Sequence, residues 1–236
     1  RKNSTQTTLL HVEQSGMEAF AIDQIFNRND TLRVGNSELS KFFALSYDWS
    51  RVRRFNLNNA LAIRLFGGIV TPFGDSEVVP FVKQYNAGGP NSVRAWRLYE
   101  LGPGSFRDPR LDEPGNTQNV IQSGEVKLEA NLEYRFDLFW RLKSALFIDA
   151  GNIWTLDDDA DRPGSTISSD WYKQLAIGTG VGFRFDFTYF IFRVDVGWKA
   201  RTPYENDNGK HWNLNSLSDF SKRSNRYTSI ALGYPF

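Results

Sequence analysis

The sequence has no cysteine, only two histidines (His11 and His211), and no apolar run of the roughly 18 residues that a membrane-spanning helix needs. The lack of cysteine excludes disulfides and thiolate metal sites, and two isolated histidines argue against a zinc site. With 28 basic and 27 acidic residues the net charge is +1, so nucleic acid is not an expected partner. A G-x-S-x-G motif is also absent. We therefore expect neither an enzyme nor a cofactor.

Three aspartates in one segment, Asp157, Asp159 and Asp161, alternate as calcium ligands would. The glycine and the bidentate glutamate of an EF-hand loop are missing, so a solvated loop is the better interpretation. No signal peptide is visible, and the chain begins at Arg1 rather than at a methionine. We therefore expect a processed product or a fragment of a longer protein.

Apolar and polar residues alternate with a period of two, which predicts β-strands whose two faces differ in character. The clearest strand is 125–136, with charged residues on one face and Val, Leu, Ala, Tyr and Phe on the other. The same pattern predicts strands at 5–14, 43–49, 61–65, 141–151, 174–186, 190–199 and 226–236. About eight strands of this kind suit a tilted membrane sheet. The side chains expected to face lipid are Leu132, Tyr134, Val181, Phe183, Phe192, Val194, Ile230 and Leu232, and those expected to face the lumen are Lys127, Glu129, Arg184, Arg193 and Asp195.

The connections between these strands alternate between short (51–57, 137–139, 187–189) and long (15–38, 71–123, 152–173, 200–225). Outer-membrane barrels have short periplasmic turns and long extracellular loops. Aromatic residues gather at the short-turn end, where an interfacial girdle belongs. A soluble β-sandwich would explain the alternation but not the girdle. The sequence therefore predicts an all-β protein, a transmembrane antiparallel β-barrel of the bacterial outer membrane.

The loop 70–124 is unusually long for a sheet protein, and loops of this length are usually functional. At its middle Arg94 stands between the apolar Val93 and Trp96, with Gly-Gly-Pro before it and Gly-Pro-Gly after it. Glycine and proline on both sides predict a sharply bent backbone that presents one cationic tip. An eight-stranded barrel is filled by its own side chains and cannot hold such a loop. We therefore expect residues 1–236 to be the C-terminal half of a larger barrel, whose N-terminal strands and periplasmic domains are absent from this chain.

Three segments resemble the outer-membrane assembly factors of the BamA/TamA superfamily. The tip Val93-Arg94-Ala95-Trp96 resembles the family's V-R-G-[FY] loop, while NLEYRF (131–136) and FIDAGNIW (147–154) resemble its strand-12 and strand-13 segments. Ala95 departs from the usual glycine, and AWR followed by LGPGS is closer to the TamA-like lipoprotein branch (TamL). The resemblance covers nearly the whole chain and implies strands nine to sixteen of a sixteen-stranded barrel.

The resemblance also implies that the loop folds back into the lumen, where Arg94 pairs with Glu133 and Asp149. The alternation of polar and apolar residues is consistent with this pairing, since both acids lie on the polar faces of neighbouring predicted strands. In a wet lumen such an arginine fork would contribute about a few kcal/mol at most. The alternative is that the two acids are ordinary lumen charges with other partners.

Gly178, Gly180 and Gly182 fall on one face of a predicted strand. This G-x-G-x-G pattern is not a nucleotide-binding loop, because it lies within a strand and does not precede a helix. Missing side chains let another segment approach closely or let the strand bend. Both interpretations, a docked loop and plain barrel curvature, stay open.

The last predicted strand is the edge that would close the barrel against a first strand outside this chain. Gly233 and Pro235 weaken that seam, since glycine adds no packing and proline donates no ladder hydrogen bond. Unpaired backbone groups there could template an incoming strand. The terminal segment also resembles the β-signal by which barrels are recognised, with Ala231 where that pattern prefers glycine. The seam and signal residues are Ile230, Leu232, Gly233, Tyr234, Pro235 and Phe236.

The resemblance implies a non-enzymatic assembly and translocation factor that inserts or exports client proteins through a laterally openable seam. Its partners would be the outer-membrane lipid bilayer, unfolded client proteins, and a TamB-like periplasmic bridge protein or accessory assembly subunits. Two alternatives stay open. One is a two-partner secretion-type transporter or other outer-membrane channel, and the other is lipid transport with a periplasmic bridge partner.

Overall fold

The structure, a computed structural model, describes residues 3–17, 33–34, 37–38, 40–112, 120–187, 189–206, 209–214 and 216–236. In these ranges the regular elements are β-strands and short 3-10 helices. None of the helices formed by the described residues is long and apolar enough to cross a membrane. The all-β fold class predicted from the alternation is confirmed.

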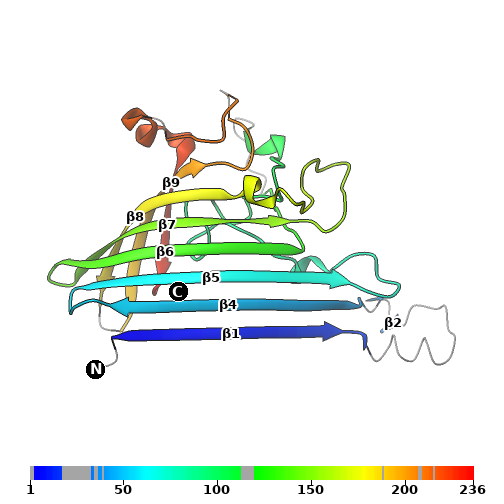
Figure 1. Cartoon of the computed structure of the whole chain (residues 1–236), viewed down its shortest axis with the longest axis horizontal. Coiled ribbons are helices and arrows are strands. Elements are labelled where there is room, and N and C mark those ends of the chain that lie inside the picture. The colour runs from blue at the N-terminus through cyan, green and yellow to red at the C-terminus, as the bar shows by residue number, and fades with distance from the viewer. Residues whose placement is uncertain are drawn as a thin grey trace.

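Eight strands form one antiparallel sheet in which each strand pairs with its neighbours along the chain. They are β1 (Ser4–Ser15), β4 (Phe42–Arg54), β5 (Asn59–Pro72), β6 (Val126–Phe139), β7 (Leu142–Trp154), β8 (Ala176–Asp186), β9 (Ile191–Arg201) and β10 (Arg226–Leu232). A separate small hairpin pairs β2 (Arg33–Val34) with β3 (Ser37–Glu38). Figure 1 shows the large sheet curling, so that β9 and β10 run behind β6 to β8. Because β1 and β10 stand at the two ends of the strand order, the sheet is an open, curved wall.

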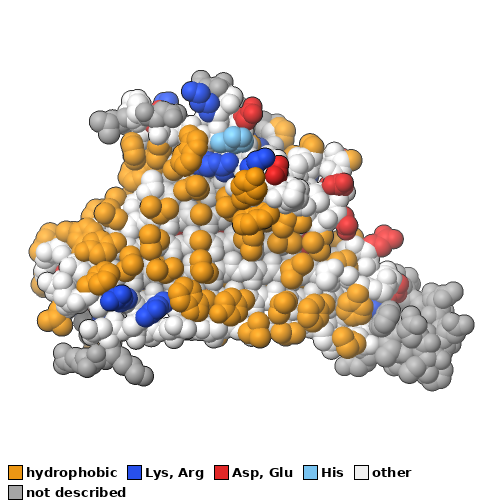
Figure 2. Space-filling view, in the orientation of Figure 1, with side chains coloured by type: hydrophobic (Ala, Val, Ile, Leu, Met, Phe, Trp, Pro, Cys, Tyr) orange, Lys and Arg blue, Asp and Glu red, His pale blue; other side chains and the backbone are white. Residues whose placement is uncertain are grey.

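The two faces of the sheet differ as the alternation predicted. On β6, Leu132 and Tyr134 are 40% and 38% exposed, whereas Asn131 and Glu133 are buried. We call the first face the outer face and the second the inner face. Figure 2 views the outer face, where apolar side chains spread over the strands. On β8 to β10 the residues predicted to face lipid are exposed or half-buried, and Arg184, Arg193 and Asp195 are buried on the inner face. Lipid contact on one side and a filled interior on the other produce this pattern.

The connections alternate in length around the sheet. The turns 55–58, 140–141 and 187–190 are short, while residues 16–41, 73–125, 155–175 and 202–225 form long loops. Phe139, Trp140 and Tyr189 are largely exposed at the short-turn end, where an interfacial girdle belongs. The predicted alternation of turns and loops is therefore present, with boundaries shifted by a few residues.

The last strand is shorter than the sequence predicted. β10 ends at Leu232, so the expected range 226–236 is too long at its C-terminal end. Gly233 has φ +81°, a left-handed conformation that only glycine adopts without strain. Its N–H donates to the carbonyl of Ile191 at 2.8 Å, which is the last backbone bond from this segment to β9. The chain then leaves the sheet.

The residues after Gly233 turn toward the inner face of β6. Arg135 Nη2 donates to the carbonyl oxygen of Phe236 at 3.1 Å. The guanidinium carbon of Arg135 lies 4.4 Å from the centre of the Tyr234 ring and 5.7 Å from that of Phe236. Tyr234 and Phe236 therefore lie against Arg135 and not with the exposed aromatic residues of the short turns. The left-handed turn at Gly233 redirects the chain, and Arg135 binds its last residues.

Candidate functional site

The described residues between β5 and β6, 73–112 and 120–125, cover the inner face of the sheet. The loop tip packs into an apolar cluster with β7 and β8, whose buried members are Ala87, Val93, Ala95, Trp96, Leu101, Ile153 and Ala176. Gly89 N donates to Trp96 O at 2.8 Å, and Tyr85 and Gly124 exchange two backbone hydrogen bonds. The apolar residues on both sides of Arg94 therefore hold the tip against the sheet.

Asp149 on β7 receives three hydrogen bonds from Arg94. Nε and Nη2 donate to Oδ2 and Oδ1, each at 2.9 Å, and the backbone N–H donates to Oδ2 at 3.1 Å. Asn131 on β6 adds a fourth, from Nδ2 to Oδ1 at 2.9 Å, and also donates to Ser92 O at 3.1 Å. Two parallel bonds to one carboxylate require the planar guanidinium fork, which lysine lacks.

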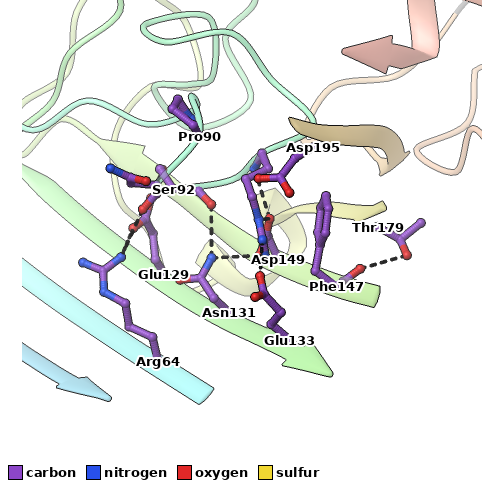
Figure 3. Close-up of polar contacts among 12 residues, drawn as sticks. Arg64, Pro90, Ser92, Glu129, Asn131, Glu133, Phe147, Asp149, Thr179 and Asp195 are labelled. Atoms are coloured by element: carbon purple, nitrogen blue, oxygen red, sulfur yellow. Dashed lines mark hydrogen bonds and ion pairs between the residues drawn. The ribbon is translucent and has the colours of Figure 1, made fainter. Parts of the chain in front are cut away.

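Glu133 on β6 is shared by three arginines. Arg94 Nη1 and Arg184 Nη2 both donate to Oε2, the latter at 2.9 Å, and Arg135 Nε donates to Oε1 at 2.7 Å. The Arg94 guanidinium also lies over the ring of Phe147, 3.7 Å from its centre. Figure 3 shows Glu133, Asp149 and Phe147 projecting from the two neighbouring strands toward one point.

Arg94, Glu133 and Asp149 have completely buried side chains. Burial alone would lower the pKa of Arg94, but the charge and hydrogen bonds of Asp149 and the charge of Glu133 raise it above its ordinary value. Because these three side chains are completely buried, they are shielded from water, whereas a wet lumen had been expected. Removing one partner from a buried pair leaves an uncompensated charge and costs about 3–5 kcal/mol.

A second set of contacts holds the tip next to Arg94. Ser92 Oγ donates to Glu129 on β6, and Arg64 on β5 donates to the same carboxylate at 3.3 Å (Figure 3). Arg64 also forms a fork with Asp48 on β4, at 2.7 to 3.0 Å. Lys127 Nζ lies 3.0 Å from Glu129 Oε1. This chain of charges extends the docking surface from β6 to β4.

β9 holds the tip from the other side. Arg193 Nη2 donates to Pro90 O at 2.9 Å and to Asn91 Oδ1 at 2.7 Å. Lys199 Nζ donates to Glu100 Oε1 at 2.5 Å. The tip is therefore fixed by side chains from β5, β6, β7 and β9.

Glycines on β8 and β9 make room for the loop. A Cβ at Gly178 would lie 2.7 Å from the Cβ of Ala95, and one at Gly197 would lie 2.9 Å from its Cα. Gly180 and Gly182 instead make room for a phenylalanine ring on β7 and an arginine on β8. Loop docking thus explains Gly178, while side chains within the sheet explain the other two.

All five residues predicted for the contact between loop and lumen, Val93, Arg94, Trp96, Glu133 and Asp149, lie in this cluster. The predicted seam residues lie apart from it, although Arg135 touches both Glu133 and Phe236. Sequence reasoning missed Ser92, Asn131 and Phe147. The signal for Phe147 was present, because it is an aromatic residue on the same face of its strand as Lys143 and Asp149.

The chemistry available at this site is positioning. Its acids and bases are tied into ion pairs, and the described part of the chain holds no group of three or more His, Cys, Asp or Glu that could hold a metal ion. What the arrangement does is fix one long loop at one place inside a curved sheet.

Known proteins share both this sheet and parts of the sequence. The Omp85 superfamily domain matches residues 26–220. Sorting and assembly machinery component 50 homolog A of Xenopus laevis is 30% identical over 111 residues, which is 44% of this chain and 22% of that protein. Outer membrane protein assembly factor BamA of Neisseria meningitidis is 28% identical over 116 residues, or 45% of this chain and 14% of that protein.

The crystal structure of BamA from Haemophilus ducreyi lacking POTRA domains 1-3 has the same fold. It superposes with a TM-score of 0.55 at 15% identity, covering 87% of this chain and 41% of that one. The matches with the two sequence relatives span less than a quarter of their lengths. Since the superfamily domain covers most of the chain, the chain belongs to the Omp85 superfamily and is a BamA/TamA-type β-barrel protein of the bacterial outer membrane.

Proposed function

We propose that this chain forms the C-terminal half of a sixteen-stranded barrel that inserts client proteins into the outer membrane through a seam at β10. The observation that carries the proposal is the early end of β10 at Leu232 and the inward turn of the residues after Gly233. A strand that leaves the sheet early gives the seam fewer ladder bonds than its neighbours have.

The physical argument concerns the edge of β10. This strand has seven residues, while β6 and β7 have 14 and 13. Each ladder bond contributes only about 0.5–1.5 kcal/mol net, so opening a short seam is inexpensive. Lipid cannot satisfy the freed N–H and C=O groups, so an incoming client strand is the natural partner for them.

The docked loop has a complementary role. Ion pairs from three strands, β6, β7 and β9, and a hydrogen bond from Arg64 on β5 keep residues 85–101 on the inner face, so the space behind β6 to β9 is filled by protein. A filled interior disfavours a passive channel and directs clients to the wall of the barrel. The names of the two sequence relatives support this proposal, since one is a sorting and assembly machinery component and the other an outer membrane protein assembly factor.

The partners that follow are the lipid bilayer, unfolded client proteins, and a TamB-like bridge protein or accessory assembly subunits. The assignment to the TamL branch stays a prediction from Ala95 and the residues after it. A secretion transporter would instead pass its substrate through the lumen, and that route requires the loop to leave the inner face.

A disulfide across the seam tests the proposal. One cysteine replaces Thr228 on β10, and the second is placed opposite it on the strand that closes the barrel. Under oxidising conditions we expect client insertion into vesicles to fall at least tenfold and to return on reduction, while the barrel stays folded.

The matched control is a disulfide between directly opposed residues inside the sheet, Val181→Cys with Val196→Cys. This disulfide joins β8 to β9 and leaves the seam free, so client insertion should continue at the normal rate. Normal insertion by the seam-linked protein would refute the proposal and favour transport through the lumen.

A further inference from the structure

An apolar groove of about 410 Å³ crosses the outer face of the sheet. It lies between two rows of outward side chains that the strand register places side by side. One row is Leu61, Tyr134, Leu146 and Val181, and the other is Leu132, Ile148, Thr179 and Trp198. Neighbouring rows on one face of a sheet are about 7 Å apart, since each strand rises about 3.4 Å per residue.

The groove rises toward the long-loop end of the barrel. On β5 it starts at Leu61, near the short turn 55–58, and on β9 it reaches Trp198, close to the strand end at Arg201. The groove therefore runs from within the apolar band to the boundary on the side of the long loops.

A segment of the loop 202–225 closes the upper end of the groove. Phe220, in the 3-10 helix η4 (Leu217–Ser221), lies edge-on to Trp198 with ring centres 5.5 Å apart. Trp198 Nε1 donates to Phe220 O at 2.8 Å. A tryptophan with an apolar ring and a satisfied N–H is typical of the membrane boundary.

Basic side chains stand beside this end. Arg226 lies directly opposite Trp198 on β10 and points to the same face. Arg223 and Lys222 follow Phe220 within the same loop, and all three basic residues are exposed. Lys222 is 2.7 Å from Asp219, whereas the described ion pairs include neither Arg223 nor Arg226.

We propose that the groove binds one acyl chain of an anionic, phosphate-bearing membrane lipid, whose headgroup lies against Arg226 and Arg223. The apolar lining fits the chain, and two cations at the boundary fit the phosphate. This site is on the opposite face from the docked loop, so it does not depend on the function proposed above.

The test measures lipids retained by the purified full-length protein, with native mass spectrometry in detergent. Dioleoylphosphatidylglycerol and dioleoylphosphatidylcholine are the two probes. We expect the wild type to retain the anionic lipid about fivefold more, as one or two boundary cations imply. Arg226→Gln should abolish this preference, while Arg141→Gln at the short-turn end should keep it.

A second pair of variants tests the groove itself. Val181→Trp fills it and should reduce retention of both lipids at least fivefold, whereas Val194→Trp lies on the same face outside it and should change little. A heat-modifiable band on a gel verifies that each variant is folded. Equal retention of both lipids by the wild type, or equal retention by the two tryptophan variants, would overturn the proposal. So would a photo-crosslinker at Val181 that captures a protein subunit in intact membranes.

Discussion

Arg94 is bound by more groups than a single ion pair requires. Asp149 accepts hydrogen bonds from Nε, Nη2 and the backbone N–H of Arg94, and Glu133 accepts one from Nη1. The ring of Phe147 covers one face of the guanidinium. The side-chain contacts depend on the planar shape of the guanidinium. A lysine would supply the charge from a single nitrogen, which cannot form the two parallel bonds of the fork.

We expect Arg94→Ala to release the loop tip, because the buried Asp149 loses its main partner and Glu133 loses one of three arginines, at a cost of about 3–5 kcal/mol. Arg94→Lys should give an intermediate result. Hydrogen exchange of residues 88–105 measures the effect, and protection should fall at least tenfold for alanine. Arg97→Ala, an exposed arginine in the same loop, is the control. Equal protection in the two alanine variants would contradict the assigned role of Arg94.

Gly197 and Gly178 should not tolerate alanine. The added Cβ would lie 2.9 Å from Ala95 Cα at Gly197 and 2.7 Å from Ala95 Cβ at Gly178, so the loop must shift. Overpacking of this kind costs about 1–3 kcal/mol. Gly67→Ala is the matched control, since its Cβ would meet only Leu128 Cδ2 at 3.5 Å. Thermal unfolding and loop protection should change for the first two variants and stay unchanged for the third.

At the scale of elements, the strands separate lipid from interior by alternation alone. An arginine at Leu132 on the outer face should cost about 2–4 kcal/mol, because the charge lies in the apolar band. Reversible urea unfolding in lipid vesicles gives this free energy. Val82→Arg places the same charge on an exposed valine in the loop 73–125 and should cost little. Similar costs at both sites would mean that Leu132 does not face lipid.

Arg135 connects two elements that are far apart in the sequence. It donates to Glu133 in the Arg94 cluster and to the carbonyl of Phe236 at the end of the chain. We expect Arg135→Ala to free residues 234–236, so that the amide hydrogens of Tyr234 and Phe236 exchange at least tenfold faster. Arg141→Ala, next to the turn between β6 and β7, should leave their exchange unchanged. Unchanged exchange in Arg135→Ala would show that Gly233 alone directs the segment inward.

At the scale of the whole molecule, the sheet and the loop are held by different interactions. Ladders between neighbouring strands define the sheet, while buried charges and a small apolar cluster hold the loop inside it. Replacing residues 88–105 with a Gly-Ser linker of equal length should therefore leave a folded barrel with a hydrated interior. Conductance in planar lipid bilayers should rise severalfold over the wild type. An unchanged conductance would mean that other segments fill the interior.

The sequence by itself determined the strands, the two faces, and the alternation of turns and loops. These features follow from local periodicity and from parity along each strand, which need no knowledge of distant contacts. Glu133 and Asp149 were identifiable because their inward parity agreed with a resemblance to known barrels.

Only the tertiary structure decided the rest. The dry surroundings of Arg94 depend on how the loop covers the inner face. Arg193 on β9 binds Pro90 and Asn91 in the tip, and both partners lie more than a hundred residues earlier in the chain. The inward turn after Gly233 depends on a partner at Arg135 that no local pattern indicates. Contacts between segments distant in sequence follow from the curvature of the sheet and from the exact pairing of its strands. The period of two within a strand fixes only the face on which each residue lies.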